Sequence, residues 1–209
     1  MDLSIEGGLC WSAPLTLVSW AGYQSRYGPY GAVDSTTPSD GSVTLVFAPE
    51  GRGTEALTRA ELGLIAWFEM HEPSVSEAVK AAILAWCAPD NAARLRDFDF
   101  DDSFPRVKSQ DDLRGLVGLH TVFVHQIETG GAPYIGYEFG CEWDVEHDLG
   151  VLMRGTELIE VGQADTAFLL WIAKADWEKK AKRPARTQLT TDAAPPPLRL
   201  SRPPAPPDR

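Results

Sequence analysis

The chain has 209 residues, 44% of them hydrophobic, which suits one globular domain with a tail. Thirty acidic residues against nineteen basic ones give a net charge of −11, which argues against nucleic acid as a partner because Lys and Arg bind phosphate backbones. No run of about 18 apolar residues occurs, so we expect no membrane span. The start, MDLSIEGG, lacks the positive charge and the apolar stretch of a secretory signal, so we expect a cytoplasmic location.

The first predicted elements are two strands followed by two helices. Residues 15–18 and 43–47 have high strand propensity and are bounded by Pro and Gly. Residues 58–61 and 74–77 are capping boxes, each followed by apolar residues at helical spacing. Pro73 lies between the two helical patterns, so the sequence predicts an αα-hairpin.

An acidic segment comes next, with Asp97, Asp99, Asp101 and Asp102 interleaved with phenylalanines. Its spacing matches the first ligands of an EF-hand, but Asp102 replaces the required Gly and Lys108 replaces the bidentate Glu, which excludes that motif. A solvated loop, a weaker cation site and a docking surface for a basic partner remain open. We keep Asp99, Asp101 and Asp102 as candidate binding residues.

The second half of the chain predicts a sheet and one more helix. Strands are expected at residues 119–127, 134–141, 149–153 and 157–161, which form an antiparallel meander. A helix over residues 165–180 follows, with Phe168, Leu169, Trp171 and Ile172 on its buried side. The predicted fold class is α+β: an antiparallel β-sheet meander with an αα-hairpin and a C-terminal helix packed on one face of it.

The C-terminal residues 183–209 differ in composition from the rest. They contain eight of the sixteen prolines and have a net charge of +3, whereas residues 1–182 have a net charge of −14. We therefore predict a single α+β domain over residues 1–182 and a disordered Pro/Arg-rich tail over residues 183–209. The tail could be simply solvated, or could recruit a partner that binds proline-rich segments.

The densest group of reactive side chains lies between two predicted strands, at Trp143, Asp144, Glu146 and His147. Two carboxylates and one imidazole could bind a metal, with His125 as the one plausible further ligand, or act as acid and base. No second cluster completes such a site, and the three cysteines form no ligand pair that would bind zinc. Buried free thiols are expected instead.

A structural role explains the same residues. Asp144 can accept a hydrogen bond from a backbone amide two residues on and close an Asx turn, and Asp148 tolerates the left-handed conformation. Trp143 would then anchor the hairpin to the core. A structural turn, a binding surface and a catalytic site all remain open at this stage.

The segment Trp143-Asp144-x-Glu146-His147-x-x-Gly150-Val151, followed by Val161-Gly162-x-Ala164-Asp165, resembles an uncharacterised bacterial family, a domain of unknown function. Its members carry a W-D-x-E-H-G-x-G-V hairpin and a downstream V-G-x-A-D segment, and the resemblance covers residues 40–172. One difference is that Asp148 stands where the family has Gly. The resemblance implies a fold but no established activity. Small acidic bacterial domains include antidotes of toxin–immunity systems, which offers an analogy.

These observations favour a non-enzymatic acidic binding protein, an immunity-type inhibitor that neutralises a basic toxin or another basic protein partner. Its candidate binding residues are Trp143, Asp144, Glu146 and His147, together with the acidic segment. The alternative is a metal-dependent enzyme or metal-binding domain that uses Asp144, Glu146 and His147. The sequence identifies no catalytic residue and no cofactor, and it leaves the oligomeric state open.

Overall fold

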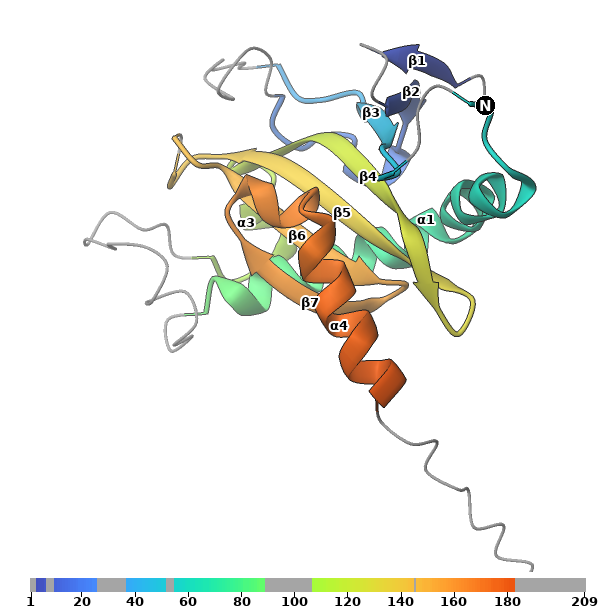
Figure 1. Cartoon of the computed structure of the whole chain (residues 1–209). Coiled ribbons are helices and arrows are strands. Elements are labelled where there is room, and N and C mark those ends of the chain that lie inside the picture. The colour runs from blue at the N-terminus through green and yellow to red at the C-terminus, as the bar shows by residue number, and fades with distance from the viewer. Residues whose placement is uncertain are drawn as a thin grey trace, which may run out of the picture.

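A seven-stranded sheet forms the centre of the protein, and its strands lie side by side in chain order (Figure 1). The computed structural model describes residues 3–6, 10–25, 37–51, 55–88, 107–144 and 146–182. Neighbouring strands are antiparallel, except that β3 and β4 pair in parallel. The strands are β1 Ser4–Glu6, β2 Cys10–Thr16, β3 Ser42–Phe47, β4 Val117–Thr129, β5 Ala132–Cys141, β6 Leu149–Arg154 and β7 Glu157–Gly162.

The combination of a mostly antiparallel sheet with helices confirms the α+β class, and the helices lie on both faces of the sheet. They are α1 Arg59–Trp86, α3 Gln110–Leu113 and α4 Leu170–Lys182, with the 3₁₀ turns η1 Val18–Trp20 and η3 Ala164–Ala167. No helix in the described ranges has the length and apolarity needed to cross a membrane. The candidate residues Asp99, Asp101 and Asp102, and the predicted tail, lie outside the described residues.

The helix α1 runs without interruption for 28 residues, so the predicted αα-hairpin is wrong. Its start is as expected, because Thr58 and Glu61 form the complete capping box. Pro73 lies inside the helix, where proline removes one backbone donor. Side chains bond to carbonyls near it: His71 Nδ1 donates to the Trp67 carbonyl at 2.7 Å, and Ser74 Oγ donates to the His71 carbonyl at 2.8 Å. Ser74 therefore supports the helix interior and does not begin a second helix.

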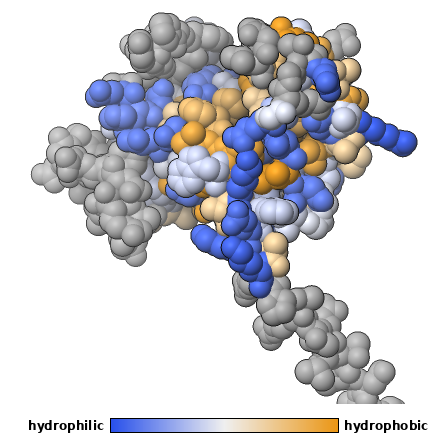
Figure 2. Space-filling view, viewed as in Figure 1, coloured by the Kyte–Doolittle hydropathy of each residue, from blue (hydrophilic) through white to orange (hydrophobic). Residues whose placement is uncertain are grey.

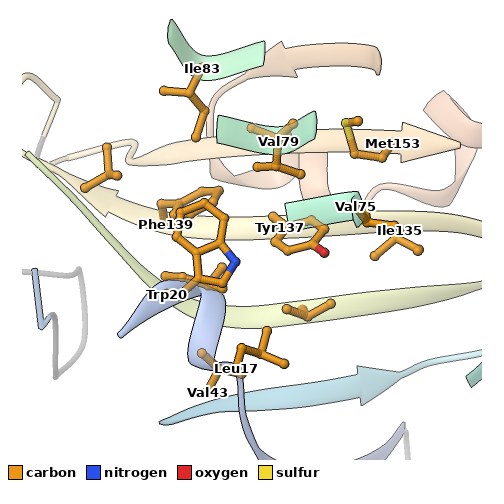
Figure 3. Packing of buried hydrophobic residues seen from close by; sticks show 14 of the residues in the cluster. Leu17, Trp20, Val43, Val75, Val79, Ile83, Ile135, Tyr137, Phe139 and Met153 are labelled. Carbon is orange, nitrogen blue, oxygen red and sulfur yellow. The ribbon is translucent and has the colours of Figure 1, made fainter. Parts of the chain in front are cut away.

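The main core lies between α1 and one face of the sheet, which we call the α1 face. Val75, Val79 and Ile83 project from α1 towards alternate residues of β5, Ile135, Tyr137 and Phe139 (Figure 3). These side chains are all fully buried, and burial of such apolar groups is the main stabilising term in folding. Burial on both sides of Pro73 offsets the roughly 3 kcal/mol that an interior proline costs a helix.

The opposite face, which we call the α4 face, is covered by η3 and α4 (Figure 1). The prediction that all helices pack on one face is therefore wrong. Close approach of η3 depends on glycine: a Cβ atom on Gly136 would lie 1.8 Å from the Ala167 carbonyl oxygen, and one on Gly150 would lie 2.3 Å from the Gln163 carbonyl oxygen.

The buried side of α4 also differs from the prediction. Leu170, Ile172 and Ala173 are its buried residues, whereas Trp171 is 63% exposed. The helix starts five residues later than predicted, because the 3₁₀ turn η3 takes residues 164–167. None of the three cysteines, all of which the structure describes, forms a disulfide, and Cys87 and Cys141 are buried as expected.

Candidate functional site

The candidate site is the turn between β5 and β6, residues 142–148, together with the side chains behind it. Two hydrogen bonds accepted by Asp144 close this turn. Its Oδ1 accepts a hydrogen bond from the backbone amide of His147 at 2.9 Å, and its carbonyl accepts one from the amide of Asp148 at 2.9 Å. The side-chain bond reaches three residues on, one further than the predicted Asx turn, so it resembles a helix N-cap.

Asp148 adopts the left-handed conformation that the sequence predicts for it, with a φ of 57°. It is only 8% exposed, and its Oδ1 lies 3.3 Å from the backbone nitrogen of Cys141, which donates to it. The carboxylate thus ties the end of the turn to the last residue of β5. A glycine would adopt this φ more easily but would lose that bond.

Trp143 anchors the turn as predicted. It packs against the main core, with its ring centroid 6.0 Å from that of Trp86 in α1. Glu146 and His147 are exposed at the tip, and the His147 Nδ1 atom lies 3.1 Å from Asp144 Oδ1. Asp144 is therefore engaged within the turn, whereas Glu146 and His147 are accessible to a partner.

A second segment, residues 107–116, lies next to the turn and carries two acidic and two basic residues. The amide of Glu142 donates to the carbonyl of Leu116 at 3.0 Å, which joins the turn to the segment that carries α3. We call residues 107–116 and 142–148 the acidic end; together they contain six acidic residues and two basic ones. Asp112 completes the capping box of α3 with the N-cap residue Ser109, and hydrogen bonds from the backbone of Lys108 and from Ser109 lower the pKa of its carboxyl.

Behind the turn, Glu138 lies on the α4 face of β5. Burial, with a smaller contribution from the nearby charge of Asp148, raises the pKa of its carboxyl to about 7 against the opposing effect of a hydrogen bond with Thr121. A β-bulge in β4 at His120 brings His120 Nδ1 to 3.6 Å from Glu138 Oε2. Burial lowers the pKa of His120, so near neutral pH this pair consists of a neutral imidazole and a carboxyl in mid-titration.

The sequence interpretation missed Glu138 and His120. A signal for Glu138 was present, because alternation along β5 places it between Gly136 and Gly140 on a face without bulky neighbours. The role of His120 had no such signal, because it depends on a bulge in the register between β4 and β5.

The metal alternative gains no support from this geometry. Within the described ranges, no group of three or more His, Cys, Asp and Glu side chains is placed to hold a metal ion. The proposed extra ligand, His125, follows Val124, which pairs with Ile135, six residues along β5 from Cys141. At about 3.3 Å per residue, His125 is about 20 Å from the turn.

The family comparison covers this whole site. The model of a domain of unknown function, DUF6985, matches residues 22–169. The chain belongs to this family. No curated protein and no solved structure is detectably similar to it. The DUF6985 match includes the turn, Glu138 and His120, but β1, β2 and α4 lie outside it.

Proposed function

We propose that this DUF6985 protein is a non-enzymatic binding protein whose acidic end docks on a basic protein partner. The observation that carries this proposal is the charge of the acidic end, six acidic residues against two basic ones, on a turn that Asp144, Asp148 and Trp143 hold in place. A turn that is already ordered loses little conformational entropy on binding. A one-sided charge steers a cationic partner and speeds its association.

The finer form of the proposal is an immunity-type inhibitor that neutralises a basic toxin in the bacterial cytoplasm. The net charge of −14 over residues 1–182 supports it, because charge complementarity gives fast association with a cationic protein. Exposed Glu146 and His147 would contact the partner, and Trp143 would support them from behind.

The test compares two charge-matched double variants of the full chain. Glu142→Gln with Glu146→Gln removes two charges from the acidic end, and Glu69→Gln with Glu178→Gln removes two exposed charges elsewhere. Each protein is used to capture partners from a lysate of the native host in low salt, and the captured protein is then purified for kinetics. We expect wild type and the Glu69/Glu178 variant to retain one basic protein at stoichiometric level.

For the acidic-end variant we expect an association rate constant lower by roughly tenfold, and a smaller dependence of that rate on NaCl concentration. Equal losses in both double variants would contradict the proposed surface. Binding that does not weaken in high salt would contradict the electrostatic mechanism.

A further inference from the structure

A cavity of about 320 Å³ lies on the α4 face, away from the acidic end. Its floor comes from the strands, with Val46 of β3 and Phe123 of β4, and its opposite wall comes from Phe168 and Leu170 where η3 passes into α4. Figure 2 shows this face of the molecule, where hydrophobic side chains lie on both sides of the hydrophilic column of α4. The volume is in the range of small-molecule sites in proteins.

The cavity follows from how the chain crosses the sheet. Glycines let η3 contact β5 and β6 directly, but β4 presents Phe123 on the same face. The ring of Phe123 packs against that of Phe168, with centroids 5.5 Å apart. These two rings separate the chain between η3 and α4 from the sheet at this point. Beyond Phe123 the floor includes the small residue Ala48, which leaves the space open.

His125 is a buried polar side chain in a lining that is mostly apolar. It is only 7% exposed, and its Nε2 lies 3.0 Å from the carbonyl oxygen of Ala167. A carbonyl oxygen only accepts, so Nε2 carries the proton. Burial lowers the pKa of the ring to about 4, so near neutral pH Nδ1 is an unprotonated acceptor.

Among the described residues, the hydrogen bond of this ring is made by Nε2, and Nδ1 is not one of the fully buried atoms left without a partner, so it stays accessible to a ligand. A ligand with a single donor would satisfy it. At the edge of the cavity, Glu50 accepts from Lys174 Nζ at 2.5 Å, and this ion pair links the loop after β3 to α4. Because this ion pair carries no net charge and the rest of the lining is mostly apolar, a charged ligand would find no compensating partner in the cavity.

We propose that this cavity binds a small, neutral, aromatic molecule with one N–H or O–H donor. Phe123 and Phe168 contact its ring, and Nδ1 of His125 accepts its hydrogen bond. Aromatic side chains favour offset or edge-to-face contact with such a ring. The site is separate from the acidic end and does not depend on the protein-binding proposal.

The test uses two probes that differ by one donor. Indole has the ring and the N–H, and N-methylindole has the ring alone. The full-length, ¹⁵N-labelled protein is titrated with each probe, and the NMR signals of His125 and of the backbone around Phe168 are followed. We expect saturable shifts with indole, and binding of N-methylindole weaker by at least tenfold, because its complex leaves a buried acceptor unpaired.

Two matched variants locate the binding. Ala48 is exposed on the strand side and lines the cavity, so Ala48→Leu should fill the space and abolish indole binding while His125 stays in place. Ala66→Leu makes the same change at an exposed position in α1 and should leave binding unchanged. The proposal is overturned if indole gives no saturable shifts, if both probes bind equally, or if Ala48→Leu binds indole as wild type does.

Discussion

Alternate side chains of β5 project from the two faces of the sheet, and their surroundings differ between the α1 face and the α4 face. On the α1 face, Ile135, Tyr137 and Phe139 belong to one continuous apolar core (Figure 3). On the α4 face, Gly136 and Glu138 lie under a 3₁₀ turn and beside buried polar groups. The α1 face therefore holds most of the buried apolar side chains, whereas the α4 face holds Glu138, with its raised pKa, and the cavity.

The largest effect should come from Phe139→Ala on the α1 face. Phe139 is fully buried, and truncation leaves a cavity among large neighbours, so we expect a loss of about 3–5 kcal/mol in the free energy of unfolding. Urea denaturation measures it. Phe168→Ala is the matched change on the α4 face, where the ring is half-exposed, and it should cost less than half as much. Equal costs would contradict the division between the two faces.

A smaller and more local effect is expected for Gly136→Ala. The new Cβ atom would collide with the backbone of Ala167, so η3 must move away from the sheet, at a cost of about 1–3 kcal/mol. Hydrogen exchange should become faster over η3 and α4 and stay unchanged in α1. The control is Gly63→Ala, where the space around the Cβ position is open and the helix should gain up to about 1 kcal/mol. Unchanged exchange in α4 would show that the glycine is not needed.

The sequence predicts elements better than it predicts their partners. The capping box at Thr58, the strand alternation along β5 and the left-handed Asp148 are local features, and the structure confirms each of them. The second capping box, at residues 74–77, led to the wrong prediction of a second helix. Burial on both sides of Pro73 outweighs the local signal that a helix ends there. No local pattern predicts that β4 pairs in parallel with β3, because these two strands are separated in the sequence by α1.

The sequence predicted only the exposed turn of the candidate site, because only the turn is formed by residues that are neighbours in the chain. Asp144, Glu146 and His147 are neighbours in sequence, and their spacing alone reveals a turn. Glu138 and His120 meet through a bulge between two strands, and the cavity combines β3, β4 and the start of α4. Such sites depend on long-range packing, which residue spacing does not encode.

The third effect depends on pH, and Glu138→Gln should reveal it. The pKa of Glu138 is about 7 in the folded protein, against an ordinary value of 4.5, so between these pH values the folded protein holds a proton that the unfolded chain has released. Stability therefore falls as pH rises through this window, by about 2 kcal/mol between pH 5 and pH 8. His125 has the opposite sign, because its lowered pKa makes stability fall as pH drops from 6.5 towards 4.

These two groups oppose each other in wild type, so the difference between wild type and Glu138→Gln isolates the carboxyl. We expect the glutamine variant to be more stable than wild type at pH 8, with the advantage nearly gone at pH 5, in urea denaturation at each pH. Glu69→Gln, at an exposed position in α1, should show no such trend. If the difference between wild type and Glu138→Gln were the same at both pH values, Glu138 would not titrate near neutrality. The α4 face would then lack a carboxyl that titrates near neutral pH.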